Sequence, residues 1–330
     1  MKSKKMRLAV SSGFALLLAG AMFASCSKKS TPSTPGTPPP TNPGGYDSAN
    51  QIQASALVAY FPFNGNITET KQGYSFTNSG MTFATGVKGQ ALQGADGKFA
   101  TYTQTTPLGL QSLQSFTIAF WINSGVVDTT ISPTYTPGHG AQGIFWLVDT
   151  AQQWGNLGLD LEPYGNNPDT LQIKCSFRSN ATGVVWNGWG PIIKIPGAVN
   201  TWTHVTFTYN GASSTLTGYV NGVQAGSNSL SGPYGPFNGS ETVYANDPGG
   251  NPPTTNPVPY MGNLLFENAF SLEFGTWPWD TTPQLFTKAP ARGNNWEDDF
   301  AGQLDEFRIY NVALNSTDVN SLYILEKAGF

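Results

Sequence analysis

LVAYFPF, residues 57–63, decides the fold class of this chain. Its odd positions form one apolar face, and such alternation with period two is typical of a β-strand packed on a core. The same period predicts further strands at 116–123, 143–149, 170–178, 202–209 and 303–310. Asn221-Gly222 lies between two short apolar runs. It predicts a β-hairpin, because both turn residues of such a loop need a positive φ.

The composition favours the same class of fold. The 330 residues include 38 Gly and 24 Pro, and only 11% are charged, against about 25% in an average soluble protein. A coiled coil or helical bundle would be rich in Ala, Glu, Lys and Leu, so both are excluded. Aromatic residues make up 13% of the chain, which argues against disorder over most of its length. One short C-terminal helix is expected at 316–327, with Asn315 or Ser316 as its N-cap.

Residues 1–25 are predicted to be a lipoprotein signal peptide. A basic start precedes an apolar run that ends at Ala24, and Ser25 then precedes Cys26. The stretch 23–26 resembles the lipobox of bacterial lipoproteins, and this resemblance implies that Cys26 is lipidated. An ordinary secreted protein or an uncleaved anchor is the alternative.

Residues 26–50 are rich in Pro, Ser and Thr, which predicts a semi-extended linker behind the anchor. We therefore expect an outer-membrane lipoprotein that contacts the membrane through its lipid anchor alone. Surface-exported lipoproteins of the Bacteroidetes often carry an acidic run after the lipidated cysteine, and none follows Cys26 here. The periplasmic face and the cell surface both stay open.

The charge of the mature body excludes nucleic acid as a partner. The chain has 16 basic and 20 acidic side chains, and four of the basic ones precede Cys26. Their removal leaves 12 basic side chains against 20 acidic ones. Nucleic-acid binding needs clustered Lys and Arg, and the sequence has no such cluster outside the leader.

Five segments resemble, in the same order, the laminin-G-like and concanavalin A-like jelly rolls. They are 57–66, 86–92, 116–122, 202–205 with the hairpin at 221–222, and 302–314. This resemblance to the concanavalin A-like lectin/glucanase superfamily implies a single jelly-roll β-sandwich over residues 51–330. It would consist of two antiparallel sheets, with the first and last strands paired and the short helix at the end. The fold hosts lectins, glycanases and adhesion modules, so it leaves the function open.

Asp305 is the polar residue of greatest interest in the last predicted strand. Strict alternation places it on the face of Phe307, which predicts a carboxylate pointing toward the core near a strand end. Such a carboxylate should have a partner. The implied strand pairing places Asn64 and Asn66 beside it, and side-chain oxygens with loop carbonyls would suit a structural Ca²⁺. The alternative is that Asp305 accepts backbone N–H groups of the 64–68 loop without a metal.

Tryptophans in predicted loops are the candidate ligand contacts. Flat aromatic rings stack on the apolar faces of pyranose rings, and Asn or Asp side chains bind the hydroxyl groups. The loop tryptophans are Trp186, Trp189, Trp277, Trp279 and Trp296. The alternative for each is burial in a small satellite core, where a long loop folds over the sandwich.

The sequence predicts no catalytic site. Asp160 and Glu162 stand at i and i+2 in a strand pattern, a spacing that suits the carboxylate pair of a retaining glycosidase. Their alternation with leucines instead predicts a solvated face. No Gly-x-Ser-x-Gly elbow, zinc-ligand spacing or phosphate-binding loop occurs. His204 is expected to be structural.

These observations predict a non-catalytic cell-envelope module that binds a glycan or polysaccharide or mediates adhesion. One alternative is a structural lipoprotein that interacts with other envelope proteins and has no glycan ligand. The other is a divergent glycan hydrolase or lyase. Glycan binding and reducing-sugar release would separate the three.

Overall fold

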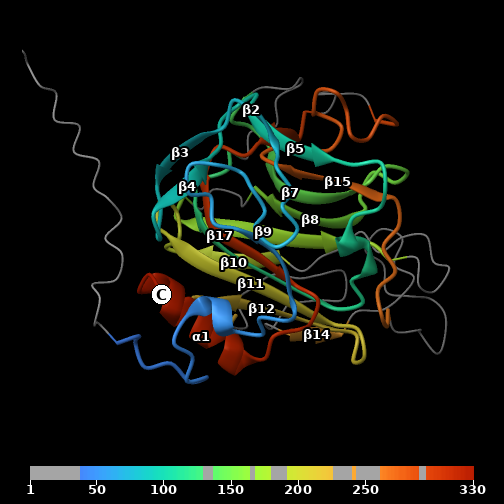
Figure 1. The fold of residues 1–330 in the computed structure, drawn as a ribbon. Helices are drawn as coiled ribbons and strands as arrows, with labels where there is room; N and C mark the ends of the chain where they lie inside the picture. The colour runs from blue at the N-terminus through green and yellow to red at the C-terminus, as the bar shows by residue number, and fades with distance from the viewer. Residues whose placement is uncertain are drawn as a thin grey trace, which may run out of the picture. The chain divides into compact units, whose positions relative to one another are not determined.

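The computed structural model describes residues 38–128, 137–163, 168–179, 192–225, 240–242, 261–289 and 295–330. Within them, two β-sheets pack face to face, as the sequence predicts (Figure 1). Residues 32–330 group as one unit. All strand pairings in the described residues are antiparallel except one, at β16 (Glu297–Asp299), which runs parallel to β7 (Ala141–Asp149).

The first sheet has nine strands in the described residues. They are β1 (Leu57–Phe61), β3 (Thr82–Thr85), β4 (Gln90–Gln93), β6 (Phe116–Asn123), β11 (Thr203–Asn210), β12 (Thr215–Val220), β13 (Val223–Gln224), β14 (Ser240–Thr242) and β17 (Gln303–Tyr310). The order is β13-β12-β11-β6-β17-β4-β3, with β1 on β17 and β14 on β12.

The second sheet has eight. Besides β7 and β16 they are β2 (Thr77–Ser79), β5 (Phe99–Thr103), β8 (Asn156–Leu161), β9 (Thr170–Phe177), β10 (Ile192–Pro196) and β15 (Ala269–Phe274). The order is β10-β9-β8-β7-β15-β5-β2, with β16 on β7. Two 3₁₀ turns, η1 (Ala49–Gln51) and η2 (Gly109–Ser112), and the helix α1 (Ser316–Lys327) complete the described elements.

Several sequence-based predictions are confirmed at the level of single residues. The strands β6 and β17 and the helix α1 have the predicted bounds, and Asn315 caps α1 by accepting from the Asp318 N–H. The pairing of β1 with β17 is antiparallel, as predicted. At the hairpin, Asn221 and Gly222 have φ values of 50° and 77°. The short helix is too short to span a bilayer, and no other described helix is long and apolar enough.

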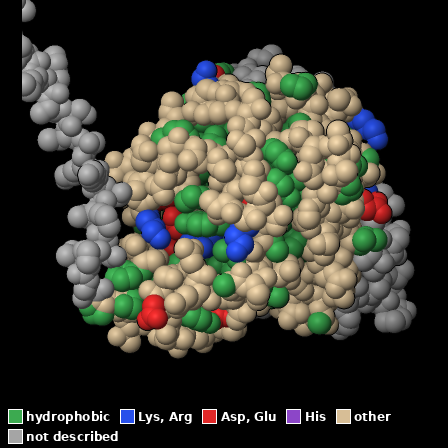
Figure 2. Space-filling model, viewed as in Figure 1, with side chains coloured by type: hydrophobic (Ala, Val, Ile, Leu, Met, Phe, Trp, Pro, Cys, Tyr) green, Lys and Arg blue, Asp and Glu red, His purple; other side chains and the backbone are tan. Residues whose placement is uncertain are grey.

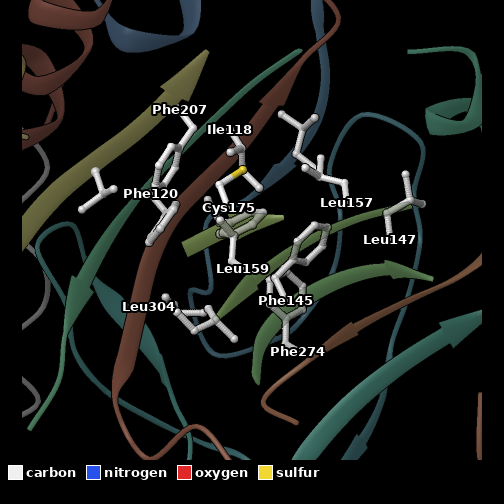
Figure 3. Close-up of a cluster of buried hydrophobic side chains, with 14 of the residues drawn as sticks. Ile118, Phe120, Phe145, Leu147, Leu157, Leu159, Cys175, Phe207, Phe274 and Leu304 are labelled. Atoms are coloured by element: carbon white, nitrogen blue, oxygen red, sulfur yellow. The ribbon is translucent and has the colours of Figure 1, made fainter. Parts of the chain in front are cut away.

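The core lies between the two sheets. Alternate side chains of the central strands point into it, among them Ile118 and Phe120 from β6 and Phe145 from β7 (Figure 3). Cys175 of β9 is fully buried in the same layer. Removal of this apolar surface from water is the main source of stability of such a sandwich.

The outer face of the nine-stranded sheet is covered by α1 and by the chain that precedes β1. Arg308 of β17 is fully buried there and donates to Glu326 of α1 at 2.6 Å and to Glu306 at 3.0 Å. Gly44 donates to Ser321 of α1 at 2.9 Å, and Ala49 is fully buried. The folded body therefore begins within residues 42–50, ahead of the predicted linker boundary.

The predicted face of Asp305 is wrong, because β17 contains a bulge. The register with β6 shifts between Asp305 and Arg308, and Glu306 has a φ of 48°. The bulge brings Leu304 into the core together with Phe307, which strict alternation separates. Asp305 is fully buried, but it pairs with Trp121, whose side chain lies under α1.

Candidate functional site

The outer face of the eight-stranded sheet carries the candidate site. On β7 and β15, Phe145 and Phe274 point into the core, so Trp146 and Glu273 point to the opposite side. These two residues stand opposite each other across the strand pairing. The segment that follows β15 crosses over them, since the Thr276 carbonyl lies directly above Gly143 of β7.

Five tryptophans gather over this face, and we call them the tryptophan cluster: Trp146, Trp154, Trp277, Trp279 and Trp296. The rings of Trp277 and Trp279 are stacked with centroids 5.4 Å apart. Trp154 lies 5.2 Å from Trp279 and 5.8 Å from Trp296. Rings at such distances attract each other beyond their buried area, by about 0.5–1.5 kcal/mol per pair.

Trp277 and Trp279 do not present a ring to solvent. They are 1% and 0% exposed, and their indole N–H groups are bound to the Asp298 carbonyl and to the Glu297 carboxylate. Both therefore form the satellite core that the sequence left as the alternative, and their prediction as direct contacts is corrected for this conformation. Trp154 and Trp296 are half-buried at the rim of the cluster. Trp186 and Trp189 lie outside the described residues.

Glycine makes room for the cluster on the sheet. A Cβ atom at Gly158 of β8 would overlap the six-membered ring of Trp146. The indole can therefore lie flat across the neighbouring strand only because this position has no side chain. A β-carbon at Gly143 would likewise overlap the Thr276 backbone. The absence of side chains at Gly143 and Gly158 therefore allows the covering segment and the Trp146 ring to lie close to the sheet.

Glu273 is an acid without a hydrogen-bond partner under this cover. It is fully buried, and neither carboxyl oxygen forms a hydrogen bond. Burial raises its pKa well above the usual value, and the nearby charges of Asp280 and Asp299 raise it further. Burial therefore favours the protonated, neutral form of this carboxyl group in the folded protein.

A second acid on the same face belongs to β8. Asp160 is 1% exposed, so the predicted solvated face is wrong at this position. Its carboxylate lies 3.9 Å from the Lys174 ammonium, which also binds Glu162. Burial raises the pKa of Asp160 to about 8, with Lys174 opposing this and the charge of Glu162 adding to it. One Lys174 ammonium thus lies beside both carboxyl groups.

Two of the predicted calcium ligands, Asp305 and Asn64, accept backbone N–H groups of the loop 86–90. Asp305 accepts the Lys88 N–H at 2.9 Å and the Glu306 N–H at 2.8 Å. The Asn64 side chain accepts the Gln90 N–H at 2.8 Å. The Asn66 side chain accepts from its own turn. Backbone N–H groups bind Asp305, as in the metal-free alternative, but they come from a different loop.

These residues fit a calcium ion poorly. Each of the three side chains already accepts a backbone N–H, and burial raises the pKa of Asp305 to about 8. A hard cation prefers ionised oxygens with free lone pairs. Over the part of the chain that the structure describes, no three His, Cys, Asp or Glu side chains form a group that could hold a metal.

His204 is structural in its surroundings. It is fully buried, and its Nε2 lies 3.5 Å from a Glu326 carboxylate oxygen under α1. Burial, and to a lesser extent the charge of Arg308, lower its pKa to about 3. The proximity to Glu326 would favour a charged ring, but the cost of burying that charge is larger, so the imidazole is neutral.

The sequence did not reveal Trp146, Trp154 and Glu273 as members of the site. Every residue of β7 is buried, so its pattern has no contrast between a core face and an outer face. Trp154 stands in a turn between two strands and lacks the Pro/Gly-rich context that marked the other loops. Glu273 offered one signal, because it is the only acid inside an apolar strand pattern at 269–274.

A protein-family model matches just under half of the chain. Residues 96–256 match the family described as the concanavalin A-like lectin/glucanases superfamily, which confirms the resemblance seen in the sequence. No curated protein matches the chain.

Solved structures with a similar fold include sugar-bound proteins. Domain 4 of AbnA, an extracellular arabinanase of Geobacillus stearothermophilus solved with arabinotriose, is 18% identical, with 81% of this chain and 97% of that one covered and a TM-score of 0.43. The receptor binding domain of the botulinum neurotoxin C/D mosaic serotype is 12% identical, with 82% of this chain and 51% of that one covered and a TM-score of 0.46. The chain thus spans about half the length of the toxin domain. These likenesses are too distant to carry an argument about function.

Proposed function

Because residues 96–256 match the concanavalin A-like lectin/glucanases superfamily, we propose that this chain is a non-catalytic carbohydrate-binding module of the cell envelope. The observation that carries the proposal is the tryptophan cluster on the outer face of the eight-stranded sheet. Its half-buried rim residues, Trp154 and Trp296, offer ring surface to a sugar. The buried members hold these two rings in place.

Preformed rings lower the cost of binding. Trp154 contacts four other rings of the cluster, so its orientation is fixed before a ligand arrives. Ordering a free side chain at an interface costs about 0.5–1.5 kcal/mol, and the cluster avoids that cost. Charged side chains are sparse among those that Figure 2 shows, in keeping with the 11% of charged residues in the sequence.

A glycan array of residues 38–330 tests the proposal. We expect the wild type to bind a defined group of glycans, and Trp154→Ala and Trp296→Ala to lose that signal. Trp202→Ala is the matched control, because Trp202 is a half-buried tryptophan that precedes β11 in the other sheet. Uniformly blank arrays for the wild type would contradict the proposal and favour the alternative of a protein-interaction lipoprotein.

The envelope location and the absence of catalysis are parts of the same proposal. Lipidation of Cys26, which lies outside the described residues, would hold the module on the outer membrane. The Lys174 ammonium that lies beside both Asp160 and Glu162 supports a non-catalytic role, because it occupies the two carboxyl groups that a glycosidase would need. Reducing-sugar release from a panel of polysaccharides by the wild type would overturn it.

A further inference from the structure

Three buried polar atoms on adjacent strands have no hydrogen-bond partner. They are both carboxyl oxygens of Glu273 on β15 and the Nε1 of Trp146 on β7. The two residues are cross-strand partners, and each is fully buried. More than about 90% of buried polar groups are hydrogen-bonded in proteins. Three such atoms in one place therefore indicate a site for polar groups that the chain itself does not supply.

The orientation of Trp146 directs its N–H toward Glu273. The Cε3, Cζ3 and Cη2 atoms of the ring lie over Gly158 of β8, and Nε1 is on the opposite edge of an indole. The neighbour of β7 on the side away from β8 is β15. The indole N–H and the carboxyl group therefore point into the same space between β7 and β15.

The groups at this place suit hydroxyl groups. A protonated carboxyl has one O–H donor and retains acceptor capacity, and an indole contributes one N–H donor. The neighbouring Asp299 carboxylate is already occupied by the Thr276 hydroxyl and the Gly97 N–H. A cation would need ionised oxygens with free lone pairs, so the remaining donors and acceptors favour a neutral, hydroxyl-bearing group.

Aromatic rings enclose the same space. The centroid of the Trp277 ring lies 5.6 Å from that of the Trp146 ring. Trp277 belongs to the segment 276–289, and Trp146 to the sheet below it. Ligand sites combine apolar and aromatic walls with a few fixed polar groups. Within the described residues, 276–289 crosses the sheet in turns and bends without pairing as a strand. Its movement would break no strand ladder, but it would break the hydrogen bonds that Thr276, Trp277 and Trp279 donate to residues 297–299.

We propose that Glu273 and Trp146 form a hydroxyl-binding subsite for a neutral sugar beneath the segment 276–289, which moves aside to admit it. This subsite rests on the proposed function and extends it inward from the rim formed by Trp154 and Trp296. The Glu273 carboxyl would both donate to and accept from a sugar hydroxyl, and the Trp146 N–H would donate to a second oxygen.

Binding and melting measured together test the subsite. The probe is the neutral oligosaccharide that gives the strongest wild-type signal on the array, titrated by calorimetry. We expect Glu273→Leu to weaken affinity at least about tenfold, and Glu273→Gln, which keeps neutral hydrogen bonding, to stay within about threefold. Trp146→Phe should weaken affinity about fivefold, because only the N–H and part of the ring are lost. Trp121→Phe, which removes an indole N–H that binds Glu326 under α1, is the control and should bind as the wild type.

The melting temperature separates binding from a structural role. An unpartnered buried carboxyl costs free energy, so Glu273→Leu is expected to melt at or above the wild-type temperature while it binds less tightly. Wild-type affinity in Glu273→Leu would overturn the subsite, and so would equal loss in Glu273→Leu and Glu273→Gln, which would indicate a bound cation. If Glu273→Leu does not fold, the affinities of Glu273→Gln and Trp146→Phe still test the subsite. A wild type that binds no glycan removes both the function and the subsite, whereas a wild type whose binding these variants leave unchanged removes the subsite alone.

Discussion

Single glycines decide where large rings can lie in this protein. Trp146 is fully buried, and its six-membered ring occupies the space directly above Gly158 of β8. The position looks unremarkable in the sequence, where glycines fall in many turns. In the structure, the Trp146 ring of the tryptophan cluster packs directly on this glycine.

Gly158→Ala is therefore expected to lower the free energy of unfolding by about 1–3 kcal/mol, the usual cost of overpacking. Urea unfolding would measure the change. Gly109→Ala is the control, because a Cβ at Gly109 meets nothing within 4 Å. An equal effect of the two substitutions would show that the ring does not depend on this glycine.

Asp305 links the stability of the protein to pH. Burial raises its pKa from 3.8 to about 8. Between these values the folded state holds a proton that the unfolded state has released, so stability is lost as the pH rises. Burial lowers the pKa of His204 from 6.5 to about 3. Between these two values the contribution of His204 to stability rises with pH, and it is complete at pH 6.5.

We expect the melting temperature to fall as the pH rises from about 6.5 to about 8, because only the acids then contribute. Asp160 acts in the same direction as Asp305, since burial raises its pKa to about 8. Asp305→Asn should make the fall shallower, whatever its effect at pH 6. Thermal melts of both proteins across this range measure it, and parallel curves would contradict the assignment.

At the scale of elements, the docking of α1 depends on one buried ion network. Arg308 binds Glu326 of α1, Glu306 of its own strand and Asn50 of η1. The Tyr60 ring lies 3.8 Å from its guanidinium carbon. One guanidinium thus joins the last strand, the helix and the chain ahead of the first strand.

Arg308→Met is expected to cost about 3–5 kcal/mol of unfolding free energy, because it leaves two carboxylates buried without their cation. Lys327→Ala, at an exposed position on the same helix, should change it by less than about 0.5 kcal/mol. Chemical denaturation of both variants provides the comparison. A small loss in Arg308→Met would mean that water reaches the network.

The bounds of several strands were predictable from the sequence, even for β6 and β17, which are buried on both faces. The bounds of β6 and β17 followed from alternation, and α1 followed from its cap and period. The bulge at Glu306 was not predictable, because nothing in the local sequence marks one extra residue in a strand. The fate of Trp277 and Trp279 depends on how a long segment lies over a distant sheet, which the residues near them do not encode.

At the scale of the whole molecule, the two outer faces of the sandwich are covered differently. A helix with charged anchors covers the nine-stranded sheet, and a tryptophan-rich segment without strand pairing covers the eight-stranded one. The first cover is held by specific ion pairs, and the second by ring contacts and by hydrogen bonds from Thr276, Trp277 and Trp279. The proposed ligand binding is assigned to the second cover.

The predicted calcium ion should contribute little to this body. Because Asn64, Asn66 and Asp305 already accept backbone N–H groups, we expect excess chelator to leave the melting temperature within about 1 °C, well below the shift of several degrees that loss of a tight ligand produces. A clear rise with calcium that Asp305→Asn abolishes would show that the loop 86–90 rearranges to bind it.

The buried thiol of Cys175 can report how often the two sheets separate. The sequence has two cysteines, and the thiol of this one is sealed between the sheets with no exposed surface. An alkylating reagent can reach it only when the layers part. In a Cys26→Ser protein, the labelling rate would thus count those openings directly, and any glycan that closes the molecule would slow it.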